Sequence, residues 1–130
     1  MIFVDTSALL AFLDADDAQN TRAVESFERL VLAGDPVSHN YVVLESAALV
    51  QRRGGSDLTR RFMRDLVPLL DLVWVDERLH DRAAREWLAG LTRGSSLVDH
   101  VSFEVMRGRG IEEAFAFDRD FTRAGFTVSP

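Results

Sequence analysis

The sequence contains no cysteine and no lysine, and each absence removes a class of chemistry. Without cysteine there is no disulfide scaffold, no thiolate zinc site, no iron–sulfur cluster and no cysteine nucleophile. Without lysine there is no Schiff-base chemistry, no P-loop lysine and no Ser–Lys dyad. The 15 basic residues are all arginines, and the three histidines do not have the spacing of a zinc site.

Long hydrophobic runs are also lacking. A membrane span needs about 20 apolar residues, and the apolar run at the N-terminus is interrupted by Asp5 and Asp14. That run has no basic residues before it, so it does not resemble a signal peptide. These features predict a protein of the cytoplasm that makes no contact with a membrane.

The chain has 130 residues, of which 47% are apolar and 28% charged, which predicts one globular domain over residues 1–130. Its 21 acidic residues outnumber the 15 arginines and give a formal net charge of −6. Proteins that bind nucleic acid by electrostatics alone are usually basic. Contact with nucleic acid would therefore require something other than bulk charge.

Short apolar segments alternate with longer segments of helical periodicity. The expected strands are residues 1–4, 37–38, 69–75, 114–117 and 127–129. The expected helices are residues 8–14, 18–33, 41–53, 57–66, 79–91 and 97–106. Thr6 or Ser7 is expected to cap the first helix, Asn40 the third and Ser96 the sixth. This alternation predicts an α/β fold with a short parallel sheet between two layers of helices.

In such a sheet, ligands bind beyond the carboxyl ends of the strands. Asp5 and Asp118 each follow an expected strand, so we expect both carboxylates at one edge of the sheet. Asp120 is an alternative to Asp118. Each of these residues could also be a simple turn or cap residue.

Two further carboxylates are in unusual surroundings. Glu45 lies in an apolar helical stretch, where an unpaired charge is costly and needs a cation, a metal or a raised pKa. It could instead have an arginine partner or lie on an exposed helix edge. Asp99 follows Ser96 with the spacing of a capping box, which is reason enough for an acid there.

If all four carboxylates converge, they cannot all stay ionised without compensation. Carboxylate oxygens are ligands suited to Mg²⁺ or Mn²⁺, which also bind substrate phosphates. Such a centre activates water for hydrolysis of phosphodiesters. A metal would also join an acidic site to a polyanionic substrate.

Four segments of the chain, in order, resemble the PIN domain of VapC-type toxins from bacterial toxin–antitoxin pairs. They are residues 2–9 (IFVDTSAL), 40–45 (NYVVLE), 96–103 (SLVDHVSF) with 105–106 (VM), and 116–121 (AFDRDF) with 124–126 (AGF). The resemblance implies a PIN-like α/β/α sandwich and a metal-dependent endoribonuclease, a hydrolase that uses metal-activated water and leaves 5′-phosphate and 3′-hydroxyl ends.

The resemblance also implies roles for individual residues. Mg²⁺ or Mn²⁺ would be held by Asp5, Asp99 and Asp118, and Glu45 would bind metal or orient the attacking water. The supporting residues would be Thr6, Ser7, Ser102 and Asp120.

Arg107 and Arg119 are the candidates for contacts with RNA. Trp74 and Trp87 are expected in the core rather than against bases.

The implied partners are a cognate VapB-type antitoxin, an RNA substrate (tRNA, ribosomal RNA or mRNA) and a second copy of the chain in a homodimer. Operator DNA would be bound only through the antitoxin complex. The alternative reading is a catalytically silent PIN-fold module that acts through its antitoxin or another partner. A receiver domain is disfavoured because it requires a late lysine, and a dehalogenase-type phosphatase because Asp5 is followed by Thr6 and Ser7.

Overall fold

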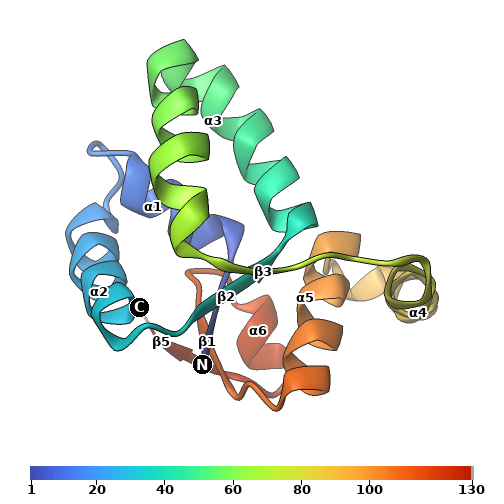
Figure 1. The fold of residues 1–130 in the computed structure, drawn as a ribbon. Coiled ribbons are helices and arrows are strands. Elements are labelled where there is room, and N and C mark those ends of the chain that lie inside the picture. The colour runs from blue at the N-terminus through green and yellow to red at the C-terminus, as the bar shows by residue number, and fades with distance from the viewer. Residues whose placement is uncertain (130) are drawn as a thin grey trace.

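The computed structural model describes residues 1–129 as one parallel sheet with helices on both faces (Figure 1). The strands are β1 (Ile2–Val4), β2 (Pro36–His39), β3 (Asp71–Val73), β4 (Glu113–Phe115) and β5 (Thr127–Ser129). The α-helices are α1 (Thr6–Leu13), α2 (Asn20–Ala33), α3 (Asn40–Arg61), α4 (Glu77–Ala89), α5 (Leu97–Arg109) and α6 (Asp120–Arg123). Short η segments cover Phe62–Leu66, Val67–Leu69 and Leu91–Arg93. The predicted α/β/α sandwich is confirmed.

The sheet has five strands in the order β3-β2-β1-β4-β5, and every neighbouring pair is parallel. Because crossovers between parallel strands are right-handed, α1, α2 and α3 cover one face, and α4, α5 and α6 cover the other. Figure 1 shows α1 and α2 on the opposite side of the strands from α5 and α6. The chain leaves β1 and β4, which are neighbours, toward opposite faces. Their carboxyl ends therefore form the switch point at which such sheets bind ligands.

The core lies on both faces of the central strands. Phe3 of β1 and Phe115 of β4 have no exposed surface, and Phe121 of α6 stacks on Phe3 with ring centroids 5.9 Å apart. Within residues 1–129, no helix combines the length and the apolar composition that crossing a membrane requires.

Two of the predicted helix caps are wrong. Asp5, rather than Thr6 or Ser7, caps α1, because its side chain accepts the Ser7 amide hydrogen. His39, rather than Asn40, caps α3. The Asn40 side chain instead accepts the amide hydrogen of Val75 over 2.7 Å, which ties the start of α3 to the segment after β3. The Ser96 cap of α5 is confirmed.

The two helices expected over residues 41–53 and 57–66 are present as two helical arms of α3 that meet at a sharp kink (Figure 1), and the second arm continues into the η segment Phe62–Leu66. Gly55 interrupts its helical backbone with φ 79° and ψ −172°, a conformation that glycine adopts without the strain of a side chain. The glycines therefore end the first arm, as expected, and the second arm follows without a loop between the two.

Candidate active site

Five carboxylates line one open pocket at the carboxyl ends of β1 and β4. The pocket has a volume of about 360 Å³. Its lining residues are Asp5, Thr6, Ser7, Leu10, Glu45, Gly94, Ser96, Asp99, Asp118 and Asp120. All four acids expected to be catalytic are in this set, and so is Asp120.

Asp5 reaches the pocket from the end of β1. Its amide donates to the Phe115 carbonyl over 3.1 Å, which continues the pairing of β1 with β4. Its Oδ2 accepts hydrogen bonds from the Ser7 amide at 3.1 Å and the Ser7 hydroxyl at 2.6 Å. Burial raises the pKa of Asp5 to about 7, against the lowering effect of the Ser7 hydrogen bonds, and the charge of Asp99 adds to the rise.

The Ser7 hydroxyl also accepts the amide hydrogen of Phe117 over 3.0 Å. Ser7 therefore links the end of β1 to the loop that carries Asp118. Thr6 is buried beside α3, and its hydroxyl accepts a hydrogen bond from Ser46 over 3.4 Å. These contacts fit the supporting role that the resemblance implies for both hydroxyl residues.

Asp99 lies in the first turn of α5 and has two local functions at once. It forms a reciprocal capping box with Ser96: the Ser96 amide donates to Asp99 Oδ2, and the Asp99 amide donates to Ser96 Oγ, each over 3.0 Å. The carboxylate is nevertheless buried in the pocket wall, and burial together with the charge of Asp118 raises its pKa. The cap orients Asp99 without removing it from the site.

Asp99, Asp118 and Asp120 form the tightest acidic cluster among the described residues, with one oxygen from each lying within 4.8 Å of the others. The expected strand ended at Phe117, directly before Asp118, but β4 ends at Phe115. Asp118 therefore lies in the loop after β4, two residues further from the strand than expected. Its Oδ1 accepts the Asp120 amide hydrogen over 2.9 Å. Burial raises the pKa of Asp120 to about 6, with further contributions from the charges of Asp118 and Asp99. Asp120 was considered as an alternative to Asp118, and the structure places both residues in the pocket.

Glu45 reaches the same pocket from α3 and is half-buried. No arginine forms an ion pair with it in residues 1–129, so the structure does not contain the core ion pair considered above. Its neighbour Leu44 is 70% exposed, which places Glu45 at the border between the apolar helix face and solvent.

Three of the expected site residues lie outside the lining of the pocket. Ser102 is fully buried and donates to the Val98 carbonyl over 3.0 Å. Arg107 forms ion pairs with Glu86 at 3.2 Å and Glu104 at 3.3 Å, in the contact between α4 and α5. Arg119 is exposed between the two pocket aspartates and has no ion pair in the described part of the chain.

The expectation that Trp74 is in the core is wrong. Its side chain is 73% exposed, because only residues 71–73 of the expected strand pair with the sheet, and β3 is an edge strand. Trp87 is half-buried.

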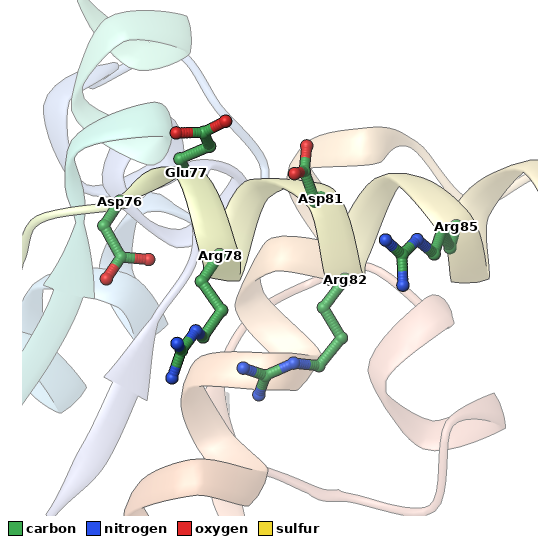
Figure 2. A pocket seen from close by; sticks show the side chains of 6 residues that line it. All are labelled: Asp76, Glu77, Arg78, Asp81, Arg82 and Arg85. Atoms are coloured by element: carbon green, nitrogen blue, oxygen red, sulfur yellow. The ribbon is translucent and has the colours of Figure 1, made fainter.

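A second hollow, of about 500 Å³, lies along α4. In Figure 2, Arg78 and Arg82 point to one side of the helix, and Glu77 and Asp81 to the other. This hollow contains no residue of the acidic pocket.

The donor set of the pocket fits a hard divalent cation. Mg²⁺ and Mn²⁺ prefer carboxylate oxygens, and the oxygens of Asp99, Asp118 and Asp120 are close enough to share one ion. Burial and the charges of neighbouring carboxylates raise the pKa values of Asp5, Asp99 and Asp120. Among the described residues, one arginine forms an ion pair with these carboxylates: Arg123 lies 3.5 Å from Asp120. No arginine lines the pocket, so a bound cation is the natural counter-charge.

Comparison with known proteins agrees with this geometry. The model of the PIN domain family matches residues 2–127. The chain is 39% identical to the 23S rRNA-specific endonuclease VapC20 of Mycobacterium tuberculosis, over 97% of this chain and 95% of that protein.

Solved structures give the same result. The crystal structure of VapC20, a sarcin–ricin loop cleaving toxin, superposes with a TM-score of 0.84 and 34% identity, covering 98% of this chain and 97% of that one. FitAcB from Neisseria gonorrhoeae superposes with a TM-score of 0.75 over 100% of this chain and 97% of that one, but its 19% identity supports only the fold. On the sequence and structural matches together, this chain belongs to the PIN domain family.

Proposed function

We propose that this protein is a toxin of a toxin–antitoxin pair that acts as a metal-dependent endoribonuclease. One observation carries the proposal: Asp5, Glu45 and the cluster of Asp99, Asp118 and Asp120 meet in one pocket at the switch point of the sheet. Clusters of carboxylates are typical of sites that bind metal and cut phosphodiesters. The similarity to the VapC20 endonuclease over nearly the whole chain supports the same activity.

The proposed substrate is ribosomal RNA. The VapC20 relative is named for the 23S rRNA and for cleavage of the sarcin–ricin loop. The 39% identity extends over nearly the whole of both chains, and the folds superpose with a TM-score of 0.84. A structured loop of the large ribosomal RNA is therefore the first substrate to test.

In the proposed mechanism, Asp5, Asp99 and Asp118 would hold Mg²⁺ or Mn²⁺, and Asp120 would complete the cluster. The ion would supply Lewis-acid activation of water and neutralise charge on the scissile phosphate. Glu45, which reaches the pocket from α3, would orient the attacking water and accept its proton. Ser7 would hold Asp5 and the loop that carries Asp118 in fixed relative positions, through its hydrogen bonds to both. The products would carry 5′-phosphate and 3′-hydroxyl ends.

The pKa values of the pocket fit this mechanism. With a pKa of about 7 for Asp5 and about 6 for Asp120, the metal-free pocket retains protons near neutral pH. Ligands must be deprotonated to bind metal, so binding of the ion would release those protons. The pocket is thereby prepared to exchange protons for a cation.

We further propose a VapB-type antitoxin as the protein partner, a homodimer as the working form, contact with operator DNA only through the antitoxin complex, and the cytoplasm as the site of action. The toxin relative supports the first of these. The structure of FitAB bound to an IR36 DNA fragment, with a TM-score of 0.74 and 20% identity, shares the fold and is itself a DNA complex.

The test is cleavage of total RNA and of intact ribosomes by the purified protein, with Mg²⁺, with Mn²⁺ and with chelator. An Asp5→Asn, Asp99→Asn double variant serves as the inactive control. We expect discrete fragments of ribosomal RNA that require metal and are absent with the variant. Cutting that persists in chelator or in the variant would contradict the proposal. A folded, metal-binding protein that cuts neither pool would favour a silent binding module.

A further inference from the structure

His39 lies at the carboxyl end of β2, and its imidazole is fully buried between two helices of the active site. Its Nδ1 accepts the amide hydrogen of Val42 over 3.3 Å, in the first turn of α3. Its Nε2 lies 2.8 Å from the hydroxyl oxygen of Ser102, on α5. Because α3 carries Glu45 and α5 carries Asp99, one ring contacts the supports of both carboxylates.

The hydrogen-bond partners determine which nitrogen of the ring carries hydrogen. The Val42 amide can only donate, so Nδ1 is the acceptor and Nε2 carries the hydrogen. The Nε2 hydrogen is then donated to Ser102 Oγ, and the Ser102 hydroxyl donates onward to the Val98 carbonyl over 3.0 Å. Each polar atom of this buried chain has a partner. Burial also lowers the pKa of His39 to about 3, which keeps the ring neutral.

The ring itself is held by its aromatic neighbours. The centroid of Phe3, in β1, lies 5.6 Å from that of His39, and the centroid of Tyr41 lies 6.1 Å away. Tyr41 in turn hydrogen-bonds to His80 of α4 over 2.6 Å. These contacts fix the position of the imidazole at the carboxyl end of β2. Serine or threonine at position 39 could cap α3 but would be too short to reach Ser102.

We propose that His39 is a positioning residue of the nuclease pocket. It holds α3 at a fixed distance from α5 and so fixes Glu45 relative to Asp99. Glu45 follows the cap by less than two helical turns, and Asp99 lies about one turn before Ser102. Over such short rigid segments, a shift of the His39 link moves the carboxylates with it. This inference rests on the proposed function.

The test compares His39→Asn with the unmodified protein in single-turnover cleavage of ribosomal RNA. The Asn oxygen takes the place of Nδ1 and keeps the α3 cap, but it cannot donate to Ser102. We expect the rate at saturating RNA to fall about tenfold or more, because small misplacements of reacting groups are costly. The RNA concentration for half-maximal rate should change by no more than about twofold, since the RNA contacts are untouched.

Two further variants separate positioning from general stability. Ser102→Ala breaks the same link from α5, so it should lower the rate similarly, and the double variant should be no slower than either single one. The matched control is Asn20→Ala, which removes hydrogen bonds to the Ala11 and Phe12 carbonyls of 2.9 and 3.0 Å, away from the pocket. It should lower the melting temperature and leave the rate unchanged.

The inference is wrong if the unmodified protein cuts RNA and the His39→Asn and Ser102→Ala variants cut it at the same rate, with only their melting temperatures lowered, as expected for Asn20→Ala. Rate losses that multiply in the double variant would also overturn it. Nitrogen-15 NMR of the His39 ring tests the link without any activity, even if the protein cuts no RNA and the proposed function fails. We expect the neutral form with hydrogen on Nε2 at pH 6 to 8; the other tautomer or a charged ring would disprove the link.

Discussion

The hydroxyl of Ser7 donates to Oδ2 of Asp5 over 2.6 Å, and it is also the acceptor for the amide of Phe117. A single side chain thus joins the end of β1 to the loop after β4, across the strand pair at which the pocket opens. The Asp5 amide, which donates to the Phe115 carbonyl over 3.1 Å, makes a second link between the same two segments. Ser7 sets the position of Asp5 relative to Asp118.

Ser7→Ala should therefore slow RNA cleavage by about tenfold or more, since the carboxylates proposed to bind metal lose their common support. The loss of two hydrogen bonds should lower the free energy of unfolding by about 1–3 kcal/mol. Single-turnover cleavage and urea unfolding measure the two effects. Ser7→Thr, which keeps the hydroxyl, should recover much of the rate; equal rates for Ser7→Ala and the unmodified protein would contradict the role given to Ser7.

The raised pKa of Asp5 predicts an unusual dependence of protein stability on pH. Its pKa is about 7 in the folded state against a model value of 3.8, so the folded state binds more protons than the unfolded state between these values. The free energy of unfolding of the metal-free protein should then fall as pH rises from about 4 to about 7. At about 1.4 kcal/mol per unit, the effect on stability is on the order of a few kcal/mol.

Asp5→Asn removes this titration while keeping the oxygen that caps α1. In chelator, the variant should be more stable than the unmodified protein at pH 8, and the two should be nearly equal at pH 4. Urea unfolding at both pH values makes the comparison, with the exposed Asp81→Asn as the control. Parallel pH dependence of Asp5→Asn and the unmodified protein would show that Asp5 titrates normally.

Added Mg²⁺ or Mn²⁺ should reverse the loss of stability at high pH. The ion binds the deprotonated carboxylates of the folded state, so its stabilising effect should be larger at pH 8 than at pH 5. Thermal unfolding with increasing Mn²⁺ measures this effect. Asp99→Asn should lose most of it, and a shift that is the same at both pH values would indicate binding elsewhere.

Asp118 and Asp120 should both contribute to metal affinity, because their oxygens lie within the same 4.8 Å cluster as that of Asp99. We expect Asp118→Asn and Asp120→Asn each to weaken Mn²⁺ binding by about tenfold or more, within the range for loss of a group that binds or orients metal. Calorimetric titration provides the affinities. If one variant binds as tightly as the unmodified protein, that residue is not a ligand.

The two arginines expected to bind RNA should behave differently. Arg119 is exposed beside the pocket and has no ion pair in residues 1–129, so Arg119→Ala should weaken RNA binding and reduce the salt slope by about 0.7 per lost phosphate contact. Arg107 is paired with Glu86 and Glu104, so Arg107→Ala should lower stability more than affinity. Binding measured from 50 to 300 mM salt separates them. Equal salt slopes for the two variants would contradict this division.

Local sequence patterns were sufficient for much of the fold. The apolar run that ends at Asp5 predicts both β1 and the position of its carboxylate, and the spacing of Ser96 and Asp99 predicts the observed capping box. These features depend on neighbours in the sequence. The convergence of the five carboxylates follows from the order of the parallel strands, which the alternation of elements indicates only in outline.

Features that depend on distant contacts could not be predicted. His39 caps α3 because Ser102, in another helix, provides a partner for its second nitrogen. Asparagine is preferred at helix caps, but the Asn40 side chain accepts a hydrogen bond from the Val75 amide instead. Trp74 is exposed because β3 is an edge strand and pairs over fewer residues than its apolar sequence indicates.

The measurement that tests the central claim most directly is the rate of ribosomal RNA cleavage as Mn²⁺ is increased, for the unmodified protein, Asp99→Asn and Asp81→Asn. Asp99 is in the pocket cluster, and Asp81 is an acid of the same type on α4, outside it. We predict that cleavage by the unmodified protein and Asp81→Asn rises and saturates with Mn²⁺, while Asp99→Asn stays at background. Cleavage that is independent of Mn²⁺, or unchanged in Asp99→Asn, would contradict the assignment of this pocket as the nuclease centre.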